Sequence, residues 1–354
     1  MSTTHEGRGL EAVLAASGEP ALDELRAALD ELLRDAGVEP RLVEQRRLKA
    51  RVFRLTFGTP ADERSYIAKR LKPEVAQRNE LVARRWLPAV GLEAHGPSLA
   101  SIAAAREGAW VWQVYDDIGG VTLADGHAPS GHLTSALVEL LAQLHGRFER
   151  HPLLGECRLW GGDLGMHFYG SSVRDGLGVL ECVRPVGPAA APAVQAVRAR
   201  LMRRLEALAA QEPGRARAMA EHGGPETLLH GDLWTTNAMA TDDQGRCHVR
   251  LIDWDHAAVG PVAYDLSTLL LRFPPVERRR LLRHYRQLAG RAGRSLPGDS
   301  ELNVLFETSE CARLANSVIW PAIVAWEEGA KWALDELAAV DRWFEELRPV
   351  LPTS

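Results

Sequence analysis

The sequence predicts an α+β fold in which a small strand-rich region precedes a larger, mainly helical region. Residues 51–57 and 65–71 alternate between apolar and polar side chains, which is the pattern of half-buried strands. From Leu133 onward, apolar residues recur mostly at helical spacing. The 354 residues leave room for two regions with separate cores. We therefore expect an N-terminal lobe over residues 1–115 and a C-terminal lobe over residues 116–354.

The N-terminal lobe is expected to combine helices with a sheet. Apolar residues at helical spacing predict a helical extension over residues 8–36, ahead of the strands. After the strands, the same spacing predicts a helix over 74–87. Residues 110–115 predict a further strand, and the polar, glycine-containing stretch 116–120 that follows is typical of a hinge.

The C-terminal lobe is expected to be built mostly from helices. A leucine stripe over 133–148 predicts the first of them. Beyond it we expect helices and loops, including a glycine-rich loop over 161–178 and a linker over 185–193. Two short strands should flank a turn at 242–245, and the pattern is helical after Pro261.

Composition argues against several classes of protein. The net charge of −5 gives no reason to expect nucleic acid or an anionic membrane as the main partner. No apolar run approaches the roughly 20 residues that span a bilayer. Four widely spaced cysteines without a C-x-x-C pair indicate reduced thiols in a cytoplasmic protein: Cys157, Cys182, Cys247 and Cys311.

Two segments carry candidate chemistry. Residues 228–237 read Leu-Leu-His-Gly-Asp-Leu-Trp-Thr-Thr-Asn, and residues 251–255 read Leu-Ile-Asp-Trp-Asp. Phosphoryl transfer needs a carboxylate that deprotonates the attacking hydroxyl and oxygen ligands that hold Mg²⁺ on the phosphates. We expect Asp232 to be the base and Asn237 and Asp253 to be the metal ligands. Taken singly, each of them would fit a cap, a turn or a loop equally well.

The order His-Gly-Asp, four residues, Asn, and then Ile-Asp-Trp-Asp resembles the motifs of the aminoglycoside phosphotransferase and choline kinase-like superfamily. These proteins are small-molecule kinases. The resemblance covers about residues 40–290. It implies a protein-kinase-like bilobal fold with ATP and Mg²⁺ as cofactors, and it places the catalytic loop 228–237 and the metal-binding segment 251–255 in the C-terminal lobe.

Two further polar residues belong to these segments, and a third lies shortly after them. His230 is expected to hold the loop in shape through backbone hydrogen bonds, because kinase-type transfer needs little acid catalysis. The resemblance implies that Asp265 ties down the catalytic loop. Asp255 is a candidate for substrate contact, for support of the metal ligands or for a second Mg²⁺.

The nucleotide phosphates need a cation from the N-terminal lobe. Lys69 lies within a predicted strand, where an inward lysine needs a charged partner. The family pattern indicates that Lys69 points inward and pairs with Glu80 on the following helix. Because side chains alternate along a strand, the alternative is that Arg70 is the buried residue and Lys69 faces solvent.

The rest of the nucleotide site is less well marked. No G-x-G-x-x-G precedes Arg51, and the corresponding segment 45–50 is basic. Its side chains either meet the phosphates or form a solvated charged loop. The resemblance implies an adenine pocket at the hinge, formed through backbone groups by Gln113, Tyr115, Asp117 and Ile118.

Substrate-contacting residues are the least determined. Trp160 and Trp234 are the best candidates. The tail from Trp326 to Glu346 is acidic and rich in tryptophan, a composition that suits a cationic acceptor. A solvated face of an amphipathic surface helix explains the same composition.

The sequence therefore predicts an ATP- and Mg²⁺-dependent phosphotransferase that phosphorylates a hydroxyl of a small molecule. An aminoglycoside-like antibiotic, and with it a role in resistance, or an amino alcohol is the expected acceptor class, and sugars and amino acids such as homoserine are further candidates. A nucleotide-binding regulatory module without catalytic activity, like a pseudokinase, is the alternative. We expect a monomer or homodimer. The short stretch between Asp253 and Asp265 leaves no room for an activation loop, which disfavours a protein kinase.

Overall fold

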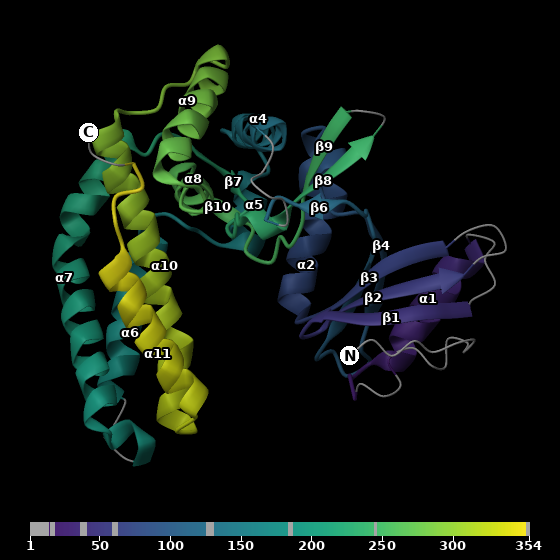
Figure 1. Cartoon of the computed structure of the whole chain (residues 1–354), viewed down its shortest axis with the longest axis horizontal. Coiled ribbons are helices and arrows are strands. Elements are labelled where there is room, and N and C mark those ends of the chain that lie inside the picture. The colour runs from purple at the N-terminus through teal and green to yellow at the C-terminus, as the bar shows by residue number, and fades with distance from the viewer. Residues whose placement is uncertain are drawn as a thin grey trace. The chain divides into compact units, whose positions relative to one another are not determined.

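The computed structural model describes residues 14, 18–35, 41–58, 63–124, 131–182, 187–243 and 246–351. By packing, the chain forms two compact units (Figure 1). The strand-rich unit comprises residues 1–137 and 236–257, and the helical unit comprises residues 138–235 and 258–354. The strand-rich unit therefore includes residues 116–137 and 236–257, which were expected to belong to the C-terminal lobe. The α+β class is confirmed.

A five-stranded antiparallel sheet forms the centre of the strand-rich unit, in the order β1-β2-β3-β5-β4. Its strands are β1 (Arg41–Lys49), β2 (Val52–Gly58), β3 (Glu63–Leu71), β4 (Leu99–Ala104) and β5 (Val111–Asp116). The predicted strands correspond to β2, β3 and β5. Strand β1 was not predicted, and it includes most of the basic segment 45–50.

Alternation along the strands gives the sheet two different faces. One face is covered by α1 (Leu22–Asp35), the described part of the predicted extension 8–36; most of residues 8–17 and residue 36 lie outside the described residues (Figure 1). The buried side chains of this face come from α1 and all five strands, and they include Leu25, Leu29, Leu33, Leu42, Phe53, Leu55, Phe57, Tyr66, Ala68, Ala103, Trp112 and Val114. The intervening residues, including Lys69, therefore belong to the opposite face.

The predicted helix 74–87 is present but not uniform. It begins as α2 (Pro73–Leu81), passes through a π-helical turn at Val82–Trp86 and ends as α3 (Leu87–Ala89), after which a 3₁₀ turn covers Glu93–His95. A second, smaller sheet of this unit has the order β6-β8-β9. Its strands are β6 (Val121–Thr122), β8 (Ala238–Asp243) and β9 (Arg246–Leu251). Strands β8 and β9 confirm the pair predicted around 242–245; residues 244–245 themselves are not described.

Helices make up most of the other unit, together with one short strand pair, β7 (Glu226–Leu229) and β10 (Ala258–Pro261). The helices are α4 (Gly131–Phe148, shared with the first unit up to Leu137), α5 (Leu154–Gly161), α6 (Met166–Cys182), α7 (Pro192–His222), α8 (Ala263–Leu270), α9 (Pro275–Arg291), α10 (Asp299–Glu327) and α11 (Lys331–Glu346); a 3₁₀ turn covers Gly187–Ala190. The predicted glycine-rich loop at 161–178 is wrong, because most of it lies in α6. There Gly170 and Gly176 are buried among neighbouring side chains.

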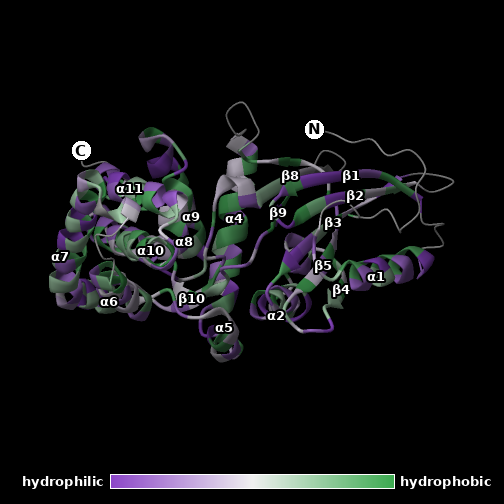
Figure 2. Ribbon diagram, turned by 90° about the horizontal axis from the view of Figure 1, so that it is seen from below, coloured by the Kyte–Doolittle hydropathy of each residue, from purple (hydrophilic) through white to green (hydrophobic). Residues whose placement is uncertain are grey.

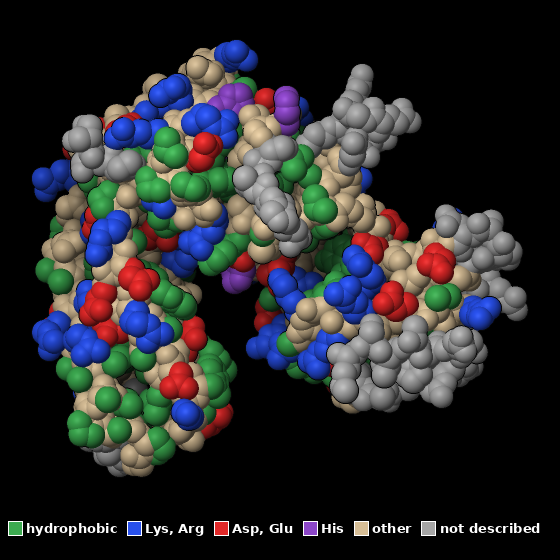
Figure 3. Space-filling view, in the orientation of Figure 1, with side chains coloured by type: hydrophobic (Ala, Val, Ile, Leu, Met, Phe, Trp, Pro, Cys, Tyr) green, Lys and Arg blue, Asp and Glu red, His purple; other side chains and the backbone are tan. Residues whose placement is uncertain are grey.

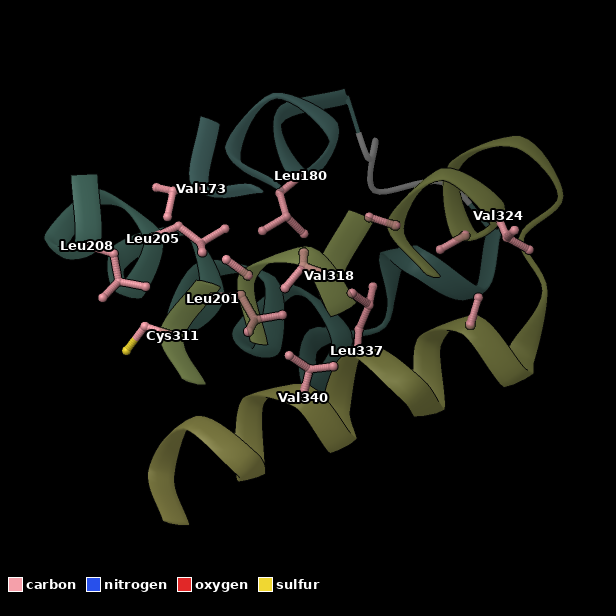
Figure 4. Packing of buried hydrophobic residues seen from close by; sticks show 14 of the residues in the cluster. Val173, Leu180, Leu201, Leu205, Leu208, Cys311, Val318, Val324, Leu337 and Val340 are labelled. Carbon is pink, nitrogen blue, oxygen red and sulfur yellow. The ribbon is translucent and has the colours of Figure 1, made fainter. Parts of the chain in front are cut away.

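The core of the helical unit lies where α10 packs against α6, α7 and α11 (Figure 2). Branched aliphatic side chains from all four helices meet there, among them Val173, Leu201, Val318 and Leu337 (Figure 4). In α11, Asp341 is buried and accepts hydrogen bonds from Arg200 and Arg204 of α7. This acidic residue of the tail is therefore buried in ion pairs, and it is not part of the solvated face that the surface-helix interpretation expects.

None of the described helices combines the length and apolarity that crossing a bilayer requires.

Candidate active site

An ion-paired centre lies on the face of the sheet opposite α1. The Nζ atom of Lys69 lies 2.5 Å from Asp253 Oδ1 and 2.7 Å from Asp255 Oδ1. Arg70 points to the other face, where it pairs with Glu19 at 2.6 Å and lies over the ring of Trp110. Alternation in β3 therefore gives each of the two basic residues its own acidic partners, and Lys69 is the one that faces the cavity.

The two carboxylates stabilise the charged form of Lys69. Burial alone lowers the pKa of a lysine, but here the charges of Asp253 and Asp255 and their hydrogen bonds outweigh burial. The pKa of Lys69 is consequently above its ordinary value. At neutral pH the centre is thus a fixed cation held between two anions.

Helix α2 holds Asp255 from the side. Asn79 Nδ2 donates to Asp255 Oδ1 at 2.8 Å, and the guanidinium of Arg78 donates to the Asp255 carbonyl. The predicted Lys69–Glu80 ion pair is wrong: Glu80 accepts from Arg84, one helical turn away, at 3.0 Å. Asn79, rather than Glu80, is on the helix face that meets the charged centre.

Asp253 has an unusual backbone. Its φ of +64° is in the left-handed region, which residues other than glycine seldom adopt and which Asp and Asn tolerate best. The neighbouring Trp254 is buried, and its Nε1 donates to the Leu251 carbonyl at 2.9 Å. This anchored ring and the strand before it keep the turn in place. The backbone therefore directs the Asp253 carboxylate to Lys69.

A cavity of about 450 Å³ adjoins the centre within the strand-rich unit. Lys69, Asn79, Asn237 and Asp253 line it together with largely apolar side chains, which include Val52, Ile67, Ile118, Met239 and Ile252. Asn237 lies beside the Asp253 segment because the Ile252 amide donates to the Asn237 carbonyl at 2.9 Å. The mixture of apolar walls and a few charged groups is typical of a small-ligand site.

The hinge residues contribute unequally to this cavity. Tyr115, Asp117 and Ile118 line it, and Asp117 pairs with Arg54 at 2.7 Å. Gln113 is completely buried: its Nε2 donates to the Ala76 carbonyl at 2.8 Å, and its Oε1 accepts from the Tyr115 hydroxyl at 2.6 Å. Gln113 is therefore outside the cavity lining, contrary to its predicted place in the nucleotide site.

The hydroxyl group of Tyr115 stays protonated and hydrogen-bonded to the side chain of Gln113. Burial, reinforced by the charges of Asp255 and Asp253, raises the pKa of Tyr115. Its hydroxyl accordingly stays protonated and keeps donating to Gln113, which links the hinge strand to α2.

The basic segment of β1 meets the cavity through Leu48 and Lys49. Lys49 Nζ lies 3.9 Å from Asp253 Oδ2. Arg47 instead lies over the Phe53 ring. Lys49 is thus the residue of this segment best placed for a phosphate.

The residues at the centre suit a hard divalent cation. Asp253 and Asn237 offer carboxylate and amide oxygens, and Asn79 Oδ1 is buried with no hydrogen-bond partner among the described residues. The described residues contain no group of three or more His, Cys, Asp or Glu that forms a metal site by itself. Mg²⁺ is commonly held by one or two carboxylates with the remaining positions filled by water and phosphate, so this donor set fits it.

In the helical unit, the catalytic loop is fixed by Asp265 of α8. Asp265 Oδ2 accepts from the His230 amide at 2.8 Å, and Oδ1 accepts from the Gly231 amide at 2.9 Å. Gly231 has a φ of +81°, which lets the chain turn sharply at this point. The role implied for Asp265 by the family resemblance thus fits the geometry.

Asp265 is fully buried and still charged. Burial raises the pKa of a carboxyl group, but the hydrogen bond and charge of His145 and the interactions with His230 outweigh it, so the pKa of Asp265 is below its usual value. His145 Nε2 lies 3.4 Å from Asp265 Oδ2, and its Nδ1 is 2.8 Å from the Tyr285 hydroxyl. The buried polar network of Asp265, His145 and Tyr285 therefore holds the catalytic loop in place.

Asp232 itself is partly exposed at the end of this supported turn. Its amide lies 3.4 Å from His230 Nδ1, and its carbonyl accepts from the Trp234 amide at 2.9 Å. Trp234 is exposed, and the guanidinium of Arg272 lies 3.9 Å from its ring centroid. Trp160 is exposed on α5.

Sequence reasoning missed Asn79, Lys49 and Arg272. A helical register that begins at Pro73 would have shown that Asn79 and Glu80 face different directions. Lys49 was within the basic segment that was considered but not singled out. No local sequence pattern identifies Arg272, because it is far from Trp234 in the sequence and contacts it only in the folded chain.

Comparisons with known proteins identify the family and the fold of the chain. The profile described as the phosphotransferase enzyme family (APH) matches residues 48–298. No curated protein matches the sequence. Solved structures with the same fold include a spectinomycin phosphotransferase in complex with ADP and spectinomycin, with 14% identity, a TM-score of 0.57, and coverage of 91% of this chain and 94% of that one.

Two other solved structures are similar to this chain in fold. The choline kinase from Streptococcus pneumoniae has 14% identity and a TM-score of 0.51, with coverage of 90% of this chain and 98% of that one. The GDP complex of an aminoglycoside 2'-phosphotransferase has 14% identity and a TM-score of 0.55, with coverage of 92% and 100%. At these identities the structures establish the kinase-like fold, and the family profile, which spans most of the chain, shows that the protein belongs to the phosphotransferase enzyme family.

Proposed function

We propose that the protein is a Mg²⁺-dependent kinase that transfers the terminal phosphoryl group of ATP to a hydroxyl of a small molecule. The observation that carries this proposal is the pairing of Lys69 with Asp253 and Asp255 at the wall of a ligand-sized cavity. The set combines a cation for phosphates with oxygen ligands for a metal ion. Both are requirements of phosphoryl transfer.

In this proposal, the strand-rich unit binds the nucleotide. Val52, Ile67 and Ile118 offer apolar contacts to the base, and the hinge backbone offers its hydrogen bonds. When the nucleotide binds, Lys69 exchanges its ion pair with Asp253 for a contact with the phosphates. Asp255 keeps its position because Asn79 donates a hydrogen bond to it. Asp253 and Asn237 would hold Mg²⁺, which neutralises charge on the phosphates when it is bound.

Asp232 is the proposed catalytic base. During transfer, a bond forms between phosphorus and the acceptor oxygen, and the bond between phosphorus and the bridging oxygen of ADP breaks. Asp232 orients the acceptor hydroxyl and takes its proton late in the step. His230 and Asp265 act by holding the loop, since Asp265 accepts from the backbone amides of both His230 and Gly231.

Several acceptor classes are compatible with the family. Spectinomycin phosphotransferase and choline kinase share the fold, so an antibiotic or an amino alcohol is a first candidate. In this proposal Trp234 and Trp160 are candidate contacts for the acceptor. Because the structural neighbours include both an ADP and a GDP complex, GTP is the alternative donor to ATP.

Titration calorimetry with ATP, with and without Mg²⁺, tests the nucleotide site. The wild-type protein should bind ATP at least about tenfold more tightly with Mg²⁺, a difference of about 1.4 kcal/mol. Asp253→Asn should lose that enhancement. Glu80→Ala is the control, because Glu80 pairs with Arg84 and should leave binding unchanged. Equal affinity with and without Mg²⁺ in the wild-type protein would contradict the proposal.

The competing function is a nucleotide-binding module that regulates a partner without catalysis. Such modules commonly lack the lysine, the base or the metal carboxylate, whereas Lys69, Asp232 and Asp253 are all present here. The two functions predict the same nucleotide binding and differ in turnover. Mg²⁺-dependent binding without transfer to any acceptor would favour the module.

A further inference from the structure

Arg272 occupies a distinctive place beside the catalytic loop. It follows the last residues of α8, and its backbone amide donates to the Leu269 carbonyl at 3.0 Å. Near its start, the same helix carries Asp265, which holds His230 and Gly231. Helix α8 therefore supports the loop near one end and places Arg272 over Trp234 near the other.

The guanidinium of Arg272 has a ring partner but no acid partner. It lies 3.9 Å from the Trp234 ring centroid, and it makes no hydrogen bond or ion pair with any residue of the described part of the chain. Nearby arginines are different: Arg313 is paired with Glu310, and Arg278 donates to the Phe273 and Val350 carbonyls. Arg272 is exposed, so its N–H groups are available to a ligand.

The surroundings of Arg272 favour an anion. Partial desolvation lowers the pKa of its guanidinium, and the charges of Arg313 and Arg278 lower it further. The carboxylates of Glu310 and Asp232 oppose these effects. Basic side chains also gather over α9, the helix that follows Arg272 (Figure 3). An added negative group would relieve the repulsion among these arginines.

We propose that Arg272, stacked on Trp234, binds an anionic group of the acceptor, so that the substrate is an alcohol that also carries a carboxylate or a phosphate. A guanidinium that rests on an indole face keeps its planar edge of N–H donors free, and that edge matches the two oxygens of a carboxylate or phosphate. Trp234 fixes the plane of the fork. The acceptor is then held by its acidic end while its hydroxyl reaches Asp232.

This inference rests on the proposed function, since it assigns Asp232 the acceptor hydroxyl. It also narrows the candidate acceptors to those that carry an acidic group. Choline carries a permanent positive charge and polyamine antibiotics carry several, and Arg272 would repel such groups from this part of the loop. An amino acid alcohol, a sugar acid or a phosphorylated alcohol suits it instead.

The test uses matched pairs of compounds that differ in the acidic group. Suitable pairs are homoserine and homoserine amide, gluconate and gluconamide, and glycerol phosphate and glycerol, with choline as a cationic member. Binding of each compound to the full-length protein is measured by calorimetry, with and without Mg²⁺-ADP, and ADP release from Mg²⁺-ATP is measured with each compound. The carboxylate and phosphate pairs tell the two sources of the anion apart.

The proposal predicts that at least one acidic member binds and that its neutral partner binds at least about tenfold more weakly, as expected for a lost charge-assisted hydrogen bond. Arg272→Gln should weaken binding of the acidic member by the same factor. It should also raise the KM for that compound, with kcat changed less than about threefold. Arg272→Lys, which keeps the charge but not the fork, should recover only part of the affinity. Arg342→Gln removes an exposed arginine of α11 and serves as the matched control, with no expected change.

Three results would overturn the proposal: no acidic member binds, neutral or cationic members bind as tightly, or Arg272→Gln leaves the affinity unchanged. A fall in kcat with an unchanged KM would show that Arg272 only shapes the loop. The nucleotide titrations report on the proposed function separately. If Mg²⁺-ADP does not bind while the acidic compound still depends on Arg272, the kinase proposal fails and the anion site stands.

Discussion

The charged centre of the strand-rich unit and the catalytic loop of the helical unit are stabilised in opposite ways. Around Lys69, carboxylates and a lysine pair directly beside a cavity, where a ligand can exchange with them. Around Asp265, a single fully buried carboxylate accepts two backbone amides and has no exposure to a ligand. The first arrangement is suited to binding, and the second is suited to holding a backbone in shape.

Because of this difference, substitutions in the two regions are expected to have different effects. Changes at the charged centre should alter ligand affinity and turnover with modest effects on stability, because water and ligand can replace a lost partner. Changes at Asp265 should alter stability first, because a buried amide without a partner cannot be resolvated.

The largest effect is expected for Lys69→Met. The substitution removes the cation proposed to meet the phosphates, and removing one such electrostatic contact typically lowers kcat by about 100-fold or more. Steady-state kinetics with Mg²⁺-ATP measures it. Arg70→Met is the neighbouring control: Arg70 pairs with Glu19 on the other face of β3, so kcat should stay near wild type even if stability falls. Equal losses of kcat in both variants would contradict the separation of the two faces.

Asp265→Asn should destabilise the fold by about 1–3 kcal/mol, because the amide group of Asn can accept from only one of the two backbone N–H donors. Urea unfolding measures the free energy, and activity at low temperature is expected to fall as the loop loosens. An unchanged free energy of unfolding would show that the buried carboxylate is not what holds His230 and Gly231.

The pH dependence of stability should differ between the wild-type protein and Asp265→Asn. The pKa of Asp265 is lower in the folded state than its usual value of about 3.9, so its contribution is complete above about pH 4 and is lost as the pH falls through the folded value. The wild-type free energy of unfolding should therefore decline more steeply below pH 4 than that of the variant. Parallel curves would exclude Asp265 as a source of acid sensitivity.

The smallest expected difference is between the effects of Asn79→Ala and Glu80→Ala on ATP affinity. Asn79→Ala removes the donor that positions Asp255, and we expect ATP affinity to fall about fivefold, within the usual range for one hydrogen bond. Glu80→Ala breaks an exposed pair with Arg84 that contributes about 0.3–0.5 kcal/mol, and ATP affinity should not change. A larger effect at Glu80 than at Asn79 would restore the predicted Lys69–Glu80 pair for the nucleotide-bound state.

The sequence was most informative where periodicity or a short motif determines structure. Alternation in 51–57 and 65–71 predicted β2 and β3 and left only one of Lys69 and Arg70 facing the cavity. The second of the two strands predicted around 242–245 is β9, which ends just before the polar segment of Asp253. The overall α+β class followed from these patterns.

Features that depend on tertiary contacts were not visible in the sequence. Strand β1 is an edge strand whose charged outer positions hide the alternation, as edge strands often do. The choice between Asn79 and Glu80 depends on the phase of α2, which a pattern of apolar residues alone does not fix. Gln113 lies in a strand whose alternating residues reach different surroundings, and its side chain bonds to α2 instead of lining the cavity.

ADP release from Mg²⁺-ATP, measured against a panel of hydroxyl compounds for the wild-type protein and Asp232→Asn, tests the central claim most directly. We predict that one class of acceptor stimulates release, that phosphorus NMR finds the phosphate on that acceptor, and that Asp232→Asn lowers kcat by at least about 100-fold while ATP still binds. A fully active Asp232→Asn enzyme would contradict the assignment of the base. Mg²⁺-dependent ATP binding without transfer to any acceptor would contradict the kinase itself.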